Sequence, residues 1–236
     1  MTSRQDPDAR VTARTVHPIE AESYAILRSR IDLSDRPPLV RAVIERVVHA
    51  SADLDYAAGL VCDEDALRRG WRALRDGAPI VADVAMVASG ITARRAAGEV
   101  ICRVGDPAAA ELARTEGVTR SAAAVRLAAA EAGPGAVWVI GCAPTALDAV
   151  IAADADPALV VGLPVGFVGA AESKAALRAS GLPAVSNRGE KGGSAVAAAA
   201  VNALLYTDMT TEPPPARRSA HAAAAGGALE ETGRNT

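Results

Sequence analysis

The sequence predicts an α/β fold in which a mainly parallel five-stranded sheet is covered by helices on both faces. Short β-branched runs bounded by Gly, Pro or Asp alternate with longer stretches of helical periodicity. Such alternation is typical of parallel sheets, because each crossover helix packs onto a face of the sheet. The predicted strands are 79–84, 99–104, 136–142, 158–164 and 183–187.

Helical patterns connect these strands and also flank them. The predicted helices are 18–31, 37–51, 64–76, 106–114, 120–132, 143–154, 169–180 and 192–206. One domain is therefore expected over residues 17–208. The polar segment 1–16 and the Pro-, Ala- and Gly-rich segment 209–236 are predicted to be disordered tails.

Composition narrows the class of protein. The 236 residues suit one globular domain, and half of them are hydrophobic, which is enough for a sizeable core. A net charge of −3 gives no reason to expect nucleic acid or an anionic membrane as a partner. Cys62, Cys102 and Cys142 are far apart and show no metal-ligand or disulfide spacing. With no bilayer-spanning apolar run and no signal-peptide pattern, we expect a cytoplasmic protein.

Three turns that follow predicted strands carry small and cationic residues. They are "CAPTAL" (142–147), "LPVGFVGAAESKAAL" (163–177) and "RGEKGGSAVAA" (188–198). In parallel sheets ligands bind at the carboxyl ends of strands, and free amides at a helix start bind anions. A ligand with several anionic groups is therefore expected. Glycine-rich turns also occur in α/β proteins that bind nothing there, so each turn alone supports either interpretation.

A nucleotide is the weaker ligand hypothesis for these turns. Neither "GFVGAAESK" nor "GEKGGS" fits the Walker A pattern, in which Lys directly follows the second Gly, and neither fits G-x-G-x-x-G. Stabilisation by ATP or FMN would be the sign of a nucleotide-binding α/β protein. The cationic and hydroxyl side chains of the turns instead suit scattered carboxylates.

His49 stands in the last turn of the predicted helix 37–51, off its apolar stripe. Periodicity alone favours an exposed histidine without a role. The helix dipole and Glu45, four residues earlier, would nevertheless favour the imidazolium and make a proton donor. No second histidine or cysteine lies at metal-ligand spacing, so a metal role is not expected.

Several separated segments together resemble one enzyme family. They are "HPIEAESYAILRSRIDL", "RVVHASADLD", "GAPIVADVAMVASGIT", "GVTRSAAAVRL", "IGCAPTAL", "GLPVGFVGAAESKAAL" and "GGSAVAAAAVNAL". In order and spacing, over roughly residues 17–206, they resemble the precorrin-8X methylmutase family of cobalamin biosynthesis.

The resemblance implies a flavodoxin-like three-layer α/β/α sandwich that forms a homodimer. It also implies an isomerase that moves a methyl group from carbon 11 to carbon 12 of precorrin-8X, giving hydrogenobyrinate, or does the same on the cobalt-containing substrate. The partners would be this polycarboxylate tetrapyrrole and its corrin product. Because the migration is intramolecular, no redox cofactor and no metal ion are expected.

The resemblance also implies roles for individual residues. His49 matches the family's catalytic histidine and would protonate a ring nitrogen. Ser23, Thr92 and Arg120 match residues that contact the substrate. The other expected substrate-binding residues lie in the turns and at helix starts: Ser121, Pro144, Thr145, Gly166, Gly169, Ser173, Lys174, Arg188, Gly193 and Ser194.

Three positions depart from the family pattern. Cys142 and Val118 stand where the family has asparagine, and "AAGEV" (96–100) is one residue shorter and lacks a third asparagine. Lost amides would weaken contacts with the substrate. The alternative function is therefore a non-catalytic corrinoid-binding relative that holds or hands on the product.

Overall fold

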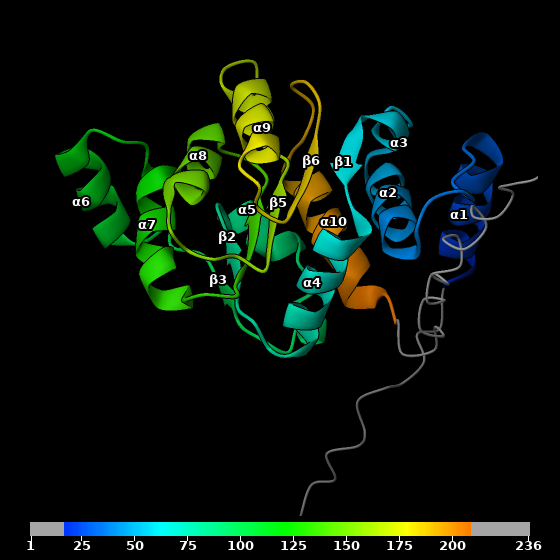
Figure 1. The fold of residues 1–236 in the computed structure, drawn as a ribbon, viewed down its shortest axis with the longest axis horizontal. Coiled ribbons are helices and arrows are strands. Elements are labelled where there is room, and N and C mark those ends of the chain that lie inside the picture. Colours follow the sequence, from blue (N-terminus) through cyan, green and yellow to red (C-terminus); the bar gives the residue numbers. More distant parts are fainter. Residues whose placement is uncertain (1–16, 209–236) are drawn as a thin grey trace, which may run out of the picture.

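The computed structural model describes residues 17–208, apart from the side chain of Arg94. The predicted tails 1–16 and 209–236 lie outside the described residues. Within that range the chain forms one sheet between two layers of helices (Figure 1).

The sheet has six strands in the order β1-β6-β5-β4-β2-β3. The strands are β1 (Leu60–Cys62), β2 (Ile80–Ala82), β3 (Val100–Ile101), β4 (Val137–Ile140), β5 (Leu159–Gly162) and β6 (Ala184–Asn187). All five predicted strands are present and run parallel, so this part of the prediction is confirmed. Counted by themselves, they follow the flavodoxin-like order 2-1-3-4-5.

The prediction of five strands was one short, because β1 pairs antiparallel with β6 at the edge of the sheet. This strand has three half-buried residues. A run this short has no detectable period of two, so local sequence does not distinguish it from a loop.

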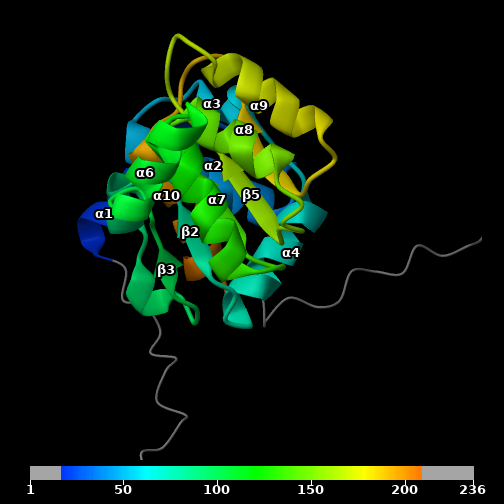
Figure 2. The same ribbon diagram turned by 90° about the vertical axis from the view of Figure 1, so that its left-hand side faces the viewer.

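The helices form two layers. One layer contains α1 (Pro18–Arg30), α2 (Pro38–Ser51), α4 (Glu64–Arg75), α5 (Ala85–Gly90) and α10 (Ser194–Tyr206). The other contains α6 (Pro107–Glu116), α7 (Arg120–Ala132), α8 (Pro144–Ala152) and α9 (Ala170–Ala179), which lie together in Figure 2. The short helices α3 (Tyr56–Gly59) and α5 and the 3₁₀ turn Ala93–Arg95 were not predicted. Each has too few residues to show helical periodicity.

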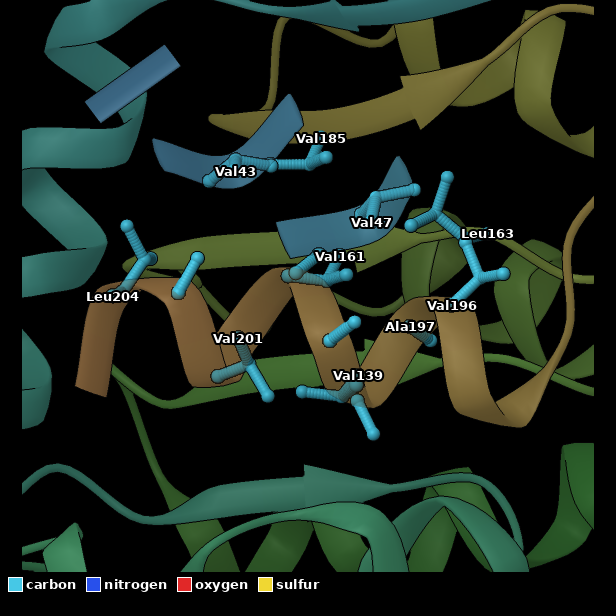
Figure 3. Packing of buried hydrophobic residues seen from close by; sticks show 14 of the residues in the cluster. Val43, Val47, Val139, Val161, Leu163, Val185, Val196, Ala197, Val201 and Leu204 are labelled. Carbon is cyan, nitrogen blue, oxygen red and sulfur yellow. The ribbon is translucent and has the colours of Figure 1, made fainter. Parts of the chain in front are cut away.

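The two faces of the sheet supply two cores. On β4, Val137 and Val139 pack with α2 and α10, whereas Trp138 and Ile140 pack with α7 and α8. Figure 3 shows the first core, in which Val43 and Val47 of α2 and Val201 of α10 meet the strand valines. Both faces are covered, so the strands read as continuous apolar runs.

Helix α2 begins at Pro38, whose fixed φ suits a first turn, and ends at Ser51. Ala52 follows with a left-handed φ of 54°. The apolar stripe of α2 is buried, and His49 lies beside it, half-buried. The end of α2 thus places one imidazole at the margin of the core.

Candidate active site

His49, on α2, contacts two side chains of α1. Its Nδ1 atom lies 3.0 Å from the hydroxyl oxygen of Ser23 on α1. The ring of Tyr24 stacks on the imidazole, with centroids 4.7 Å apart and planes 10° from parallel. The structure therefore brings together His49 and Ser23, two predicted site residues, and adds Tyr24, which sequence reasoning missed.

Glu45 has its hydrogen-bond partner on α1. Its carboxylate accepts two hydrogen bonds from Arg28, from Nε at 2.8 Å and from Nη2 at 2.7 Å. Glu45 is 7% exposed, so the guanidinium compensates a buried carboxylate. The pair ties α2 to α1 one turn before His49.

Arg46 connects the side chains around His49 to α10. Its Nη1 donates to Glu20 at 3.0 Å and to the Tyr24 hydroxyl at 3.3 Å. The Arg46 guanidinium also lies 4.8 Å from the centroid of the Tyr206 ring. These side chains line a cavity of about 430 Å³ between α1, α2 and the end of α10.

Thr92 lies at the far end of the same network. Its backbone N–H donates to Asn202 Oδ1 at 2.9 Å, and the Tyr206 hydroxyl donates to its Oγ1 at 3.4 Å. Because Tyr206 also contacts Arg46, Thr92 and His49 belong to one connected set of side chains. Asn202 fixes this segment from buried α10.

The turns after β5 and β6 pack against each other through their backbones. The Gly193 N–H donates to the carbonyl of Leu163 at 2.9 Å, and the Gly166 N–H donates to that of Glu190 at 3.1 Å. At Gly192 a Cβ atom would lie 2.3 Å from the Leu163 carbonyl oxygen, so only glycine fits. Close backbone approach, and not ligand contact, accounts for this glycine.

Lys191 fastens the turn after β6 to the turn that follows α2. Its Nζ atom lies 2.7 Å from a carboxylate oxygen of Asp53 and 2.7 Å from one of Asp55. These two ion pairs raise the pKa of Lys191. The end of α2, and with it His49, is thereby held at the carboxyl edge of the sheet, where the glycine turns also lie.

The turn 141–143 is occupied from within the chain. The Asp83 carboxylate accepts backbone hydrogen bonds from Gly141 at 3.1 Å, Cys142 at 2.8 Å and Ala143 at 2.9 Å. Burial raises the pKa of Asp83, although the three amides oppose this effect. The expectation of free amides in this turn is corrected for residues 141–143, because the Asp83 carboxylate accepts their hydrogen bonds. The feature of the sequence that could have indicated this contact is an acidic residue directly after a buried strand.

Lys174 and Ser173 are buried under the turn after β6. Lys174 is 0% exposed and donates to Asn187 Oδ1 at 3.0 Å and to the Lys191 carbonyl at 2.6 Å. Burial lowers its pKa to about 8. The Ser173 hydroxyl donates to the Ala170 carbonyl at 3.3 Å within its own helix. Lys174 thus supports the turn after β6 from inside, and the Ser173 hydroxyl has its partner within α9.

The remaining predicted residues lie around the carboxyl edge. Arg120 begins α7 and is exposed, and Thr119, just before it, shares a hydroxyl hydrogen bond of 2.6 Å with Thr145 of α8. Because α7 and α2 lie in opposite layers, Arg120 and His49 reach this edge from different faces of the sheet. The others are half-buried or exposed, except Ser194, which is buried at the start of α10: Ser121, Pro144, Thr145, Gly166, Gly169, Arg188, Gly193 and Ser194.

Within residues 17–208, no group of three or more His, Cys, Asp or Glu side chains is arranged to hold a metal ion. No helix in this range is long and apolar enough to cross a membrane.

Comparison with known proteins agrees with this architecture. Residues 18–207 match the family described as "CbiC: Precorrin-8X methylmutase". The chain is 46% identical over 196 residues to a cobalt-precorrin-8 methylmutase of Salmonella typhimurium, covering 80% of this chain and 93% of that protein. It is 43% identical over 194 residues to a precorrin-8X methylmutase of a Sinorhizobium species, covering 79% and 92%.

A solved structure supports the same assignment. The precorrin-8X methylmutase of Thermus thermophilus superposes with a TM-score of 0.73 at 35% identity, covering 81% of this chain and 98% of that one. Sequence and fold therefore agree over the whole described range. The chain belongs to the precorrin-8X methylmutase family, the isomerases of cobalamin biosynthesis.

Proposed function

We propose that this protein moves the methyl group from carbon 11 to carbon 12 of precorrin-8X, or of its cobalt-containing counterpart, with His49 as the proton donor. Membership of the family supports the reaction. The observation that carries the role of His49 is the contact of 3.0 Å between its Nδ1 and the Ser23 hydroxyl. This contact occupies one ring nitrogen and leaves Nε2 to meet the substrate.

Proton donation suits a methyl shift. A proton on a ring nitrogen of the macrocycle makes the neighbouring carbon electron-poor, which eases migration of the methyl group with its bonding electrons. The imidazolium carries protons on both nitrogens, so its Nδ1–H can donate to Ser23 while Nε2–H is transferred. The reaction is an isomerisation, and the proton returns to His49 when the product forms.

Substrate binding is assigned to the carboxyl edge of the sheet. Arg120 and Arg188 are exposed there and suit the peripheral carboxylates of the macrocycle. The hydroxyl of Ser23 would contact the substrate beside His49, and that of Thr92 would contact it at the other end of the side-chain network. Residues 17–208 are proposed as the complete catalytic domain.

A homodimer acting in the cytoplasm is proposed as the working form. Ile19 and Ile26 of α1 are 70% and 46% exposed, and Phe167 is 94% exposed. Large apolar side chains left in water favour burial by a second copy or by the substrate. Neither nucleic acid nor a membrane is proposed as a partner, because the charge of the chain is close to balanced.

The test is a product assay with the purified protein and precorrin-8X, with the cobalt-containing substrate in parallel. The visible absorption is expected to change over many turnovers with one of the two, to that of hydrogenobyrinate from precorrin-8X or to that of its cobalt-containing counterpart from the cobalt-containing substrate. A change limited to one equivalent per protein would instead identify a carrier of the product and refute catalysis.

A further inference from the structure

Tyr24 has two kinds of neighbour that give it a defined position. On its ring face it stacks on His49, with centroids 4.7 Å apart. At its other end, its hydroxyl accepts a hydrogen bond of 3.3 Å from Arg46. The Arg28 guanidinium also lies 5.6 Å from the Tyr24 centroid. Tyr24 therefore links the candidate proton donor to the charged side chains of α1 and α2.

The His49 imidazole needs two restraints to have one orientation. The hydrogen bond between His49 Nδ1 and the Ser23 hydroxyl determines which ring nitrogen faces α1, but it still permits the ring plane to rock about that contact. Parallel stacking on Tyr24, at 10° between planes, determines the plane. Together they determine the direction in which Nε2 points.

Arg46 in turn keeps Tyr24 in place. It is bonded to Glu20 at 3.0 Å and lies 4.8 Å from the Tyr206 centroid, so it has partners on α1 and α10. Its side chain is only 20% exposed, which limits the screening of these contacts by water. A tyrosine at this position therefore has an anchor that phenylalanine would lack.

We propose that Tyr24, anchored by Arg46, is a positioning residue that sets the plane of the His49 ring for proton transfer. This inference rests on the proposed role of His49. It predicts that loss of the stacked ring slows the chemical step while the substrate still binds. A misdirected proton donor lowers kcat without weakening substrate binding, because the acid must be aligned with its acceptor only in the transition state.

The experiment compares Tyr24→Leu, which removes the ring, with Tyr24→Phe, which keeps it. Ser29→Ala, at an exposed position of α1, is the matched control, since its hydroxyl donates to the Ile26 carbonyl within the same helix. For Tyr24→Leu we expect kcat to fall about tenfold with KM and the product Kd within about twofold. Tyr24→Phe should keep kcat within about threefold, since the stack is retained. A normal kcat in Tyr24→Leu, an equal loss in both variants, or a loss that appears only in KM would overturn the inference.

A measurement on the wild-type protein does not depend on activity or on the folding of a variant. NMR of protein labelled in its histidine rings should show nuclear Overhauser effects between the His49 ring protons and the Tyr24 ring. Their absence would refute the stack. If instead the stack is observed and His49→Ala keeps full turnover, the proposed function of His49 fails while the packing described here stands.

Discussion

The Nδ1 atom of His49 and the hydroxyl of Ser23 lie 3.0 Å apart, although 26 positions separate them in the chain. The contact joins the last turn of α2 to the middle of α1. Periodicity alone assigns no partner to His49. The contact gives it one defined hydrogen bond.

Ser23→Ala should lower kcat about fivefold, because one hydrogen bond contributes about 1 kcal/mol and this one orients the proposed acid. KM should change little. Steady-state kinetics on precorrin-8X measures both. Ser29→Ala is the control, since that hydroxyl donates to the Ile26 carbonyl in the same helix. Equal rates in the two variants would remove Ser23 from the mechanism.

His49→Ala should lower turnover at least ~100-fold, the usual contribution of a general acid. The product should still bind, because the ring carries none of the carboxylate contacts. Turnover is measured by absorbance, and the Kd of hydrogenobyrinate by calorimetry. His17→Ala, at the exposed start of α1, should behave as wild type. Normal turnover in His49→Ala would rule out the acid role.

Arg120→Ala should weaken product binding about tenfold, since a hydrogen bond to a charged group contributes about 1.5–3 kcal/mol, part of which water replaces. Calorimetry with hydrogenobyrinate gives the Kd. Arg114→Ala is a suitable control, because Arg114 is exposed on α6 and paired with Glu111. An unchanged Kd for Arg120→Ala would contradict its assignment to the substrate.

Asp83→Ala should lower the free energy of unfolding by about 3 kcal/mol, because three amides lose a charged acceptor. Urea unfolding measures this change, and hydrogen exchange should show faster opening of the turn 141–143. Asp148→Ala, at an exposed position of α8, is the control. A loss below about 0.5 kcal/mol, typical of surface substitutions, would show that Asp83 does not hold the turn.

Lys174 should make stability depend on pH in the alkaline range. Burial lowers its pKa from 10.5 to about 8, so between these values the unfolded chain binds more protons than the folded one. The contribution of Lys174 to the free energy of unfolding therefore rises between about pH 8 and pH 10.5. The free energy of unfolding of wild type minus that of Lys174→Met should increase by on the order of 2 kcal/mol.

Subtracting the free energy of unfolding of Lys174→Met removes the contributions of the other titrating groups, because both proteins share them. The neutral amine still has two protons for its two acceptors, Asn187 and the Lys191 carbonyl. A difference that stays flat or falls over this window would mean that Lys174 is charged in the folded protein.

Local sequence was a good guide where a segment is long or strongly patterned. The five parallel strands and the eight predicted helices are all present. Strand β1 and helix α5 were missed because three and six residues carry too little periodicity. The contact between His49 and Ser23 and the burial of Lys174 were not predicted, because a residue's place in the sequence does not reveal which way its side chain points.

The sequence by itself determined the fold class, the family and the identity of the candidate acid, because these depend on patterns and motifs contained within short segments. Only the tertiary structure decided the partners: Arg28 for Glu45, Tyr24 for His49, and the turn 141–143 for Asp83. Each of these contacts joins separate elements. Their relative rotation and separation are set by packing across the whole core, which local periodicity does not specify.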